Sequence, residues 1–212
     1  MSPSLSAPAD AAAEKRRLRA GALARRAAMG EEARRLASAA AAIHARTAMG
    51  DGPLAGRTIA VFAPFRDEID TFPLAALLRA EGARLALPVI VGRGLPLAFR
   101  LWQADDPLVP QGAYGIPTPS ETAPEATPDL VVVPLAAFDR CGGRIGYGAG
   151  FYDRTLARLR AASPVTALGY AFACQEVPRV PAEPHDEPLD MMITEHGALP
   201  CSHPFSRFCP GP

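Results

Sequence analysis

The sequence predicts a single α/β domain with a mixed, mostly parallel central sheet and helices on both faces, in a Rossmann-like three-layer arrangement. Apolar, β-branched runs alternate along the chain with segments of helical periodicity, which is typical of α/β proteins. The run Leu130–Val133 lies between two prolines and has no polar face, as expected of a strand buried on both sides. The length of 212 residues, of which 49% are hydrophobic, suits one domain with a sizeable core.

The N-terminal third is expected to be helical after a short disordered start. Residues 1–13 are mainly Ala, Ser and Pro and bury little, so we expect disorder there. Residues 14–49 are rich in Ala, Leu, Arg and Glu, which are strong helix formers. They predict one long helix or two, with a break near Gly30.

The remaining elements follow from apolar runs and helical spacing. The predicted strands are residues 57–65, 84–91, 97–102, 130–133, 165–170 and 191–194. Helices are predicted at residues 72–81 and from residue 151 onward. Residues 103–128 form a long, proline-rich connection with little periodicity. The folded domain is expected to span residues 14–200, with an irregular tail at residues 201–212.

Composition and charge exclude several classes of protein. There are 22 basic and 22 acidic residues, and this balance gives no reason to expect a nucleic acid or an anionic membrane as partner. No apolar run approaches a membrane span, and the first residues lack the order of a signal peptide. The four cysteines form no CxxC pair, which argues against zinc. We expect a cytoplasmic monomer that acts on small molecules.

A glycine-rich loop follows the central apolar run. Five glycines lie between residues 142 and 150, and Gly146, Gly148 and Gly150 alternate. Without a Cβ, such a backbone can lie close to a ligand and point several N–H groups at a phosphate. The loop is neither a Walker A sequence nor a GxGxxG fingerprint. A tight turn between strand and helix is the alternative interpretation.

Two charged residues beside the loop favour phosphate chemistry. Arg144 adds a fixed positive charge. Asp153 lies about one helical turn after the loop, where a carboxylate is suited to hold Mg²⁺ beside phosphate oxygens.

As a whole, residues 129–159 resemble the signature of the 5-formyltetrahydrofolate cyclo-ligase (5,10-methenyltetrahydrofolate synthetase) family, in its bacterial form. The residues that carry the resemblance are Pro134, Phe138, Asp139, Gly143, Arg144, Gly146, Gly148, Gly150, Phe151, Tyr152, Asp153 and Arg154. The resemblance continues from Lys15 to about Gly197. It implies an ATP- and Mg²⁺-dependent ligase of one-carbon metabolism that converts 5-formyltetrahydrofolate to 5,10-methenyltetrahydrofolate. ADP and phosphate are released through a phosphorylated formyl (imidate) intermediate.

The resemblance also implies which residues contact ATP. A KxxLR element near the N-terminus is filled by Lys15 and Arg19, which lie four residues apart and share one helix face. A solvated basic helix face is the alternative interpretation. The implied ATP contacts are Lys15, Arg16, Arg17, Leu18, Arg19, Arg144, Ile145, Gly146, Tyr147, Gly148, Ala149, Gly150, Phe151 and Tyr152. Arg144 and Tyr152 are the implied catalytic residues.

The implied folate and metal contacts come from other parts of the chain. The implied substrate contacts are Phe65, Glu68, Asp70, Tyr147, Gly148 and Tyr152, and the implied Mg²⁺ ligands are Asp153 and Asp190. The family usually carries Glu where Asp70 stands. Without the resemblance, the acids at positions 67, 68 and 70 fit the start of the next helix. Asp186 and Glu187 are interpreted as solvated.

Two rival functions remain open at this point. One is a non-catalytic sensor that binds folate or nucleotide at a degenerate site. The other is a sugar-phosphate or CoA-dependent enzyme on a similar scaffold, because a scaffold does not fix the chemistry.

Overall fold

The computed structural model of the chain describes residues 8–111 and 115–201. Within these ranges the central sheet has seven strands in the order β11-β10-β9-β6-β1-β2-β3. In that order they are β11 (Gly197–Pro200), β10 (Met191–Thr194), β9 (Thr166–Tyr170), β6 (Leu130–Val133), β1 (Thr58–Ala60), β2 (Arg84–Val89) and β3 (Ala98–Leu101). The five inner strands, from β10 to β2, are parallel to one another. The edge strand β11 is antiparallel to β10, and the edge strand β3 is antiparallel to β2. The predicted mixed, mostly parallel sheet is confirmed.

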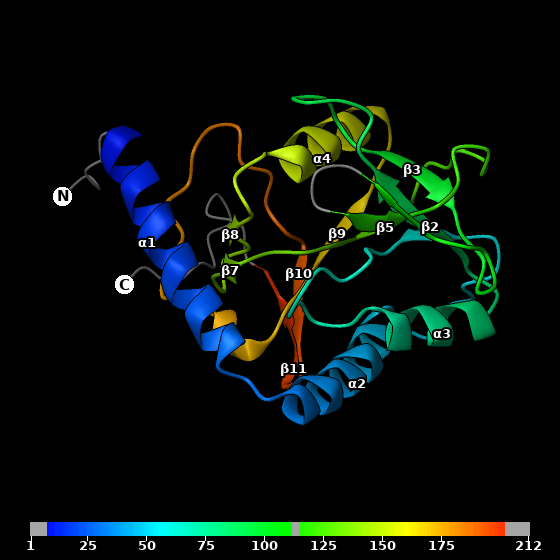
Figure 1. The fold of residues 1–212 in the computed structure, drawn as a ribbon, viewed down its shortest axis with the longest axis horizontal. Coiled ribbons are helices and arrows are strands. Elements are labelled where there is room, and N and C mark those ends of the chain that lie inside the picture. The colour runs from blue at the N-terminus through cyan, green and yellow to red at the C-terminus, as the bar shows by residue number, and fades with distance from the viewer. Residues whose placement is uncertain (1–7, 112–114, 202–212) are drawn as a thin grey trace.

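Helices cover both faces of this sheet (Figure 1). In this view α2 (Glu31–Ala48) and α3 (Phe72–Ala80) lie below the sheet, and α4 (Phe151–Ala162) lies above it. Successive strand residues point to opposite faces. Ile59 therefore packs in the core shared with α2 and α3, whereas Ala60 packs in the core shared with α4.

Two short hairpins occupy segments that the sequence analysis treated as loops. β4 (Val109–Gln111) and β5 (Ile116–Thr118) pair in the proline-rich connection, and β7 (Ala137–Phe138) and β8 (Arg144–Ile145) pair just before the glycine-rich loop. These strands have two or three residues each, too few for a period-two pattern to be recognised.

α1 (Pro8–Ala27) stands to one side of the sheet, beside the β7–β8 hairpin (Figure 1). Because this helix begins at residue 8, the expectation of disorder is wrong for residues 8–13, while residues 1–7 lie outside the described part. The alanines at positions 11–13 favour a helix, and Ala11 is buried. The predicted break is confirmed, because α2 begins directly after Gly30. No helix in the described part of the chain is long and apolar enough to cross a bilayer.

Packing around β9 leaves no space for a side chain at Gly169. A Cβ there would lie 2.5 Å from Leu189 Cδ1 and 2.6 Å from Met192 Sδ, and both neighbours are fully buried. We expect Gly169→Ala to lower the free energy of unfolding by about 1–3 kcal/mol, the usual cost of overpacking. Gly52→Ala is the matched control, because a Cβ at Gly52 meets nothing within 4 Å. Equal unfolding midpoints in denaturant for the two variants would contradict this prediction.

Candidate active site

The carboxyl ends of β1, β6 and β9 meet at one edge of the sheet, because the three strands are parallel neighbours. In open α/β sheets this is the edge where ligands bind. Residues 61–71, 134–150 and 171–180 leave the sheet here. α1 packs against the last two of these segments through Leu18 and Ala22, which form a small core with Ala137 and Val177. Three distant parts of the chain that carry predicted site residues, namely α1 and residues 61–71 and 134–150, thus lie at one edge.

The glycine-rich loop enters α4 in a conformation that glycine permits. Gly148 has a φ of 97° and Gly150 a φ of 64°, values that a residue with a Cβ adopts only at a cost. Gly150 is the residue before α4, and no side chain caps that end of the helix. The first amides of α4 and the positive end of its dipole are therefore suited to an anion. The role of the loop as a phosphate cradle stays a prediction.

The buried carboxylate of Asp139 holds the turn that precedes this loop. It accepts hydrogen bonds from the backbone N–H groups of Cys141 and Gly143, at 2.9 Å each, and of Val180 at 2.8 Å. Only glycine fits at position 143, because a Cβ would lie 2.8 Å from Asp139 Oδ2. The same side chain thus closes the hairpin turn and ties it to the segment that follows β9.

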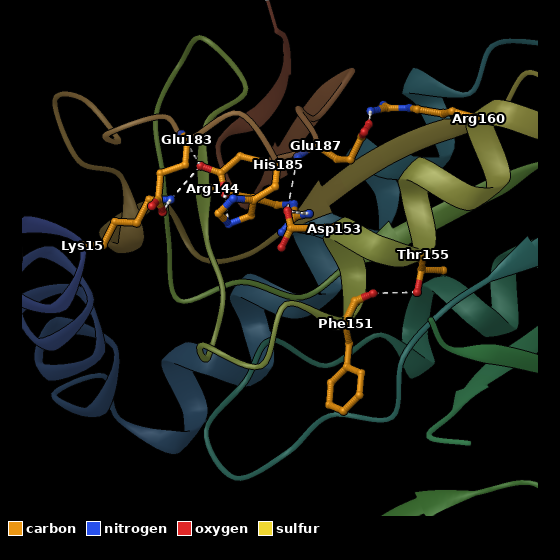
Figure 2. Close-up of polar contacts among 10 residues, drawn as sticks. Lys15, Arg144, Phe151, Asp153, Thr155, Arg160, Glu183, His185 and Glu187 are labelled. Atoms are coloured by element: carbon orange, nitrogen blue, oxygen red, sulfur yellow. Dashed lines mark hydrogen bonds and ion pairs between the residues drawn. The ribbon is translucent and has the colours of Figure 1, made fainter. Parts of the chain in front are cut away.

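Arg144 and Asp153 form a buried ion pair behind the loop (Figure 2). Their N–O distance is 2.7 Å, and their side chains are 5% and 18% exposed. The backbone N–H of Glu187 also donates to Asp153, at 3.2 Å. Removing one partner of a buried pair leaves an uncompensated charge, which costs roughly 3–5 kcal/mol. Asp153 therefore supports the fold of the site as well as being a candidate metal ligand.

Lys15 on α1 is held by two carboxylates of the segment before β10. Its ammonium lies 2.7 Å from Glu183 and 2.6 Å from Asp186 (Figure 2). We call this three-residue contact the Lys15 strap. Asp186 and Glu187 were expected to be solvated, but Asp186 pairs with Lys15 and Glu187 pairs with Arg160 at 2.7 Å.

The pKa shifts of Lys15 and Glu183 both favour the charged forms of these two side chains. Partial burial opposes the charge on Lys15, but the hydrogen bonds that Lys15 donates to Asp186 and Glu183 outweigh it and raise the Lys15 pKa above its ordinary value. The hydrogen bond to Lys15 lowers the pKa of Glu183. The contribution of Glu183 to stability is therefore present above its unfolded pKa and lost as the pH falls through its folded pKa. The contribution of Lys15 is present below its unfolded pKa and lost as the pH rises through its raised folded pKa.

The rest of the predicted N-terminal ATP element splits into three environments. Arg19 faces the glycine-rich loop, where its Nε donates to the Gly146 carbonyl at 2.8 Å. Arg16 is exposed, and Arg17 is exposed and pairs with Glu14 on the same helix. Leu18 is buried in the core. The structure thus brings Lys15 and Arg19 to the candidate site and leaves Arg16 and Arg17 at the surface.

The predicted folate-contacting acids lie in the turn after β1. Glu68 accepts a hydrogen bond from the Phe65 backbone N–H at 2.9 Å, and burial raises the Glu68 pKa above its ordinary value. Asp70 accepts a hydrogen bond from the Phe72 N–H at 2.9 Å, at the start of α3. The helix-start interpretation of the acids therefore describes Asp70 well. Both residues nevertheless lie on the edge that carries the glycine-rich loop.

Arg26 is a buried residue of this region that the sequence analysis did not single out. Its guanidinium donates to the Tyr147 hydroxyl and to Asp67, at 2.7 Å each. It packs under the edge of the sheet in a tight crevice without room for a water molecule, lined also by Phe62, Glu68, Ile69, Pro134, Leu135, Tyr170 and Gln175. Burial raises the pKa of Tyr152 well above its usual range, so its hydroxyl remains protonated.

Asp190 lies away from Asp153. Its Oδ2 accepts hydrogen bonds from Arg160 at 2.9 Å and from the Ala167 N–H at 2.7 Å. Arg160 is seven residues after Asp153 on α4, a rise of about 10 Å, whereas Mg²⁺ holds its ligands at about 2 Å. The structure thus does not bring Asp153 and Asp190 to one ion position. Asp190 instead lines an open hollow of about 600 Å³ at the opposite edge of the sheet, with Arg57, Asp129, Arg160, Ser163, Pro164, Val165 and Thr166.

We expect Asp139→Ala to loosen the glycine-rich segment. Three N–H donors, one of them fully buried, would lose their acceptor, so the free energy of unfolding should fall by roughly 3 kcal/mol, and amide exchange at Gly143 and Val180 should quicken. Asp129→Ala is the control, because Asp129 accepts from one backbone donor, Thr58 N–H at 2.7 Å, at the other edge. Unchanged exchange at Gly143 in Asp139→Ala would show that the carboxylate does not hold the turn.

Comparison with known proteins agrees with this arrangement. The 5-formyltetrahydrofolate cyclo-ligase family matches residues 11–195. The 5-formyltetrahydrofolate cyclo-ligase of Escherichia coli K12 is 37% identical to this chain, in an alignment that covers 65% of this chain and 77% of that protein. The 5-formyltetrahydrofolate cyclo-ligase of Mycolicibacterium smegmatis is 34% identical, in an alignment that covers 66% of this chain and 75% of that protein. The solved structure of Aquifex aeolicus 5,10-methenyltetrahydrofolate synthetase superposes with a TM-score of 0.69 at 27% identity, covering 93% of this chain and 96% of that one. The chain belongs to the 5-formyltetrahydrofolate cyclo-ligase family.

Proposed function

We propose that this protein converts 5-formyltetrahydrofolate to 5,10-methenyltetrahydrofolate in a reaction that consumes ATP and requires Mg²⁺. The observation that carries the proposal is the meeting of two sets of residues at one edge of the sheet. α1 and the glycine-rich loop supply cations and backbone amides for a nucleotide. The turn after β1 and the tyrosines of the loop supply a carboxylate and aromatic surfaces for a pterin ring. The names of the relatives agree with the folate substrate.

The reaction needs alignment and charge neutralisation more than covalent help from the protein. The formyl oxygen attacks the γ-phosphorus of ATP, the bond from that phosphorus to the bridging oxygen breaks, and ADP leaves. N10 of the folate then attacks the carbon of the phosphorylated formyl group. N10 loses its proton to solvent, the C–O bond to phosphate breaks as the five-membered ring closes, and phosphate leaves.

On the nucleotide side, the loop amides and the start of α4 would hold the phosphates. Arg19 is already fixed against the loop by its bond to the Gly146 carbonyl, and its remaining guanidinium nitrogens would face the triphosphate. Arg144 would neutralise charge from beneath the loop, because its buried Nε has no hydrogen-bond partner among the described residues. Ala149 offers no side-chain contact to phosphate.

On the folate side, Phe65 and Tyr152 would flank the ring, and Tyr147 would close it from the loop. Asp70 uses Oδ1 for the Phe72 N–H, so its other oxygen would accept an N–H of the pterin. Glu68 holds the backbone of Phe65 and would act by fixing that contact.

The donor set near the loop fits Mg²⁺, which prefers oxygen ligands and substrate phosphates. Asp153 would supply one carboxylate from the first turn of α4. A second would come from Asp186, because the ligand atoms of Glu183, His185 and Asp186 lie within 4.8 Å of one another and Glu187 of the same segment contacts Asp153. Asp190 lies at the opposite edge of the sheet and is therefore not proposed as a ligand of this ion. When bound, the ion would neutralise charge on the phosphates.

The first test is a spectrophotometric assay for the methenyl product with ATP, Mg²⁺ and 5-formyltetrahydrofolate. We expect turnover by the natural chain and a loss of roughly 100-fold or more in kcat for Asp153→Asn, the scale of losing one preorganised charge at a reacting centre. Asparagine is chosen over alanine because it keeps a hydrogen-bond acceptor for buried Arg144.

Asp190→Asn separates the two metal assignments in the same assay. Unchanged dependence on Mg²⁺ concentration is expected from its position beside Arg160. A large rise in the Mg²⁺ requirement would restore Asp190 as a ligand. If the natural chain binds folate without forming methenyl product, the protein is a sensor and the proposed function is wrong.

Glu183→Gln should strengthen ATP binding. Removing one carboxylate from the Lys15 strap leaves the ammonium freer to meet phosphate, and partly exposed ion pairs contribute about 0.2–1 kcal/mol. The KM for ATP should therefore fall by up to about fivefold. Glu14→Gln is the matched control, because it changes the net charge equally but releases only Arg17, an exposed residue. An unchanged or higher KM for ATP in Glu183→Gln would show that the strap does not compete with nucleotide.

A further inference from the structure

Arg26 contacts two different segments of the candidate site from a third. It lies on α1 and is 4% exposed. One terminal nitrogen donates to the Tyr147 hydroxyl in the glycine-rich loop, and the other donates to Asp67 in the turn after β1, at 2.7 Å each. Its Nε is buried and has no partner among the described residues.

The network continues on the far side of Tyr147. The Tyr147 hydroxyl also interacts with the Glu68 carboxylate, which accepts the Phe65 N–H. Tyr147 and Arg26 thus supply hydrogen bonds that connect the loop 146–150 with the turn 65–70. One phenol and one guanidinium therefore tie the position of the loop to that of the turn.

Stability alone is a poor reason for a buried arginine at this position. Within the described part of the chain its ion pair, at 2.7 Å, is with Asp67, and one buried donor is left unmatched. Burying a charge costs several kcal/mol, and well-packed apolar residues are often as stable in such a place. Arg25, the preceding residue of α1, already ties the helix to the segment after β9 through the carbonyls of Cys174 and Glu176.

We propose that Arg26 is a positioning residue that couples the nucleotide-binding loop to the folate-binding turn, so that each substrate strengthens the binding of the other. The proposal rests on the proposed function, because it takes the loop to hold the nucleotide phosphates and the turn to hold the folate. A ligand that orders Tyr147 also fixes Arg26, and a fixed Arg26 holds Asp67 and the turn. The second ligand then binds a segment whose ordering cost has already been met.

The test is titration calorimetry with a non-hydrolysable ATP analogue, with and without saturating 5-formyltetrahydrofolate. For the natural chain we expect the folate to tighten analogue binding at least fivefold, the lower end of typical coupling. In Arg26→Gln this factor should fall to about one. Arg25→Gln is the matched control and should keep the factor of the natural chain, because Arg25 docks the same helix but contacts neither segment.

Tyr147→Phe provides an independent variant if Arg26→Gln does not fold. It removes one hydroxyl from a side chain that is 48% exposed, so folding should be unaffected. Its coupling factor should also fall to about one, and KM for each substrate should cease to depend on the concentration of the other. A double variant should lose no more coupling than either single variant.

The outcomes separate this proposal from the proposed function. If the natural chain turns over both substrates but Arg26→Gln and Tyr147→Phe keep its coupling factor, the positioning role is wrong and the function stands. A coupling factor of one in the natural chain also overturns the positioning role. If the natural chain does not bind 5-formyltetrahydrofolate at all, the proposed function itself fails.

Discussion

The site depends first on the hydrogen bonds of a single buried carboxylate. Asp139 accepts three backbone N–H donors from two segments that are far apart in the sequence. An anionic acceptor with three donors is well compensated, which makes a buried charge tolerable at this position. The closed turn then determines where β8 runs. As a result Arg144 lies beneath the glycine-rich loop, within reach of Asp153.

Opposite charges on the two sides of the loop are the second constraint. The chain has no net charge, yet cations of α1 and carboxylates of the segment before β10 are concentrated at this edge. Lys15 takes two carboxylates, while Arg19 bonds to a carbonyl. A triphosphate with its metal ion would bring both signs of charge, so it can replace these contacts without leaving an ion unpaired.

Sequence patterns predicted the elements that are long and periodic. The parallel strands, the break at Gly30 and the strand-loop-helix arrangement follow from local composition. The shared face of Lys15 and Arg19 follows from helix spacing, and the same spacing continues to Arg26, at positions 15, 19, 22 and 26. That repeat was the signal by which Arg26 could have been found. It was missed because its partners lie 41 and 121 positions away.

What the sequence by itself determined is the class of fold, the family motif and the residue types available for phosphate, folate and metal. These depend on backbone propensity and on spacing within single elements, which are local properties. The tertiary structure decided which of those residues meet. It paired Arg144 with Asp153, placed Asp186 beside Lys15, and left Asp190 at the opposite edge of the sheet. Side chains from different elements become neighbours only when strand order and helix packing bring them together, and no local pattern encodes that distance.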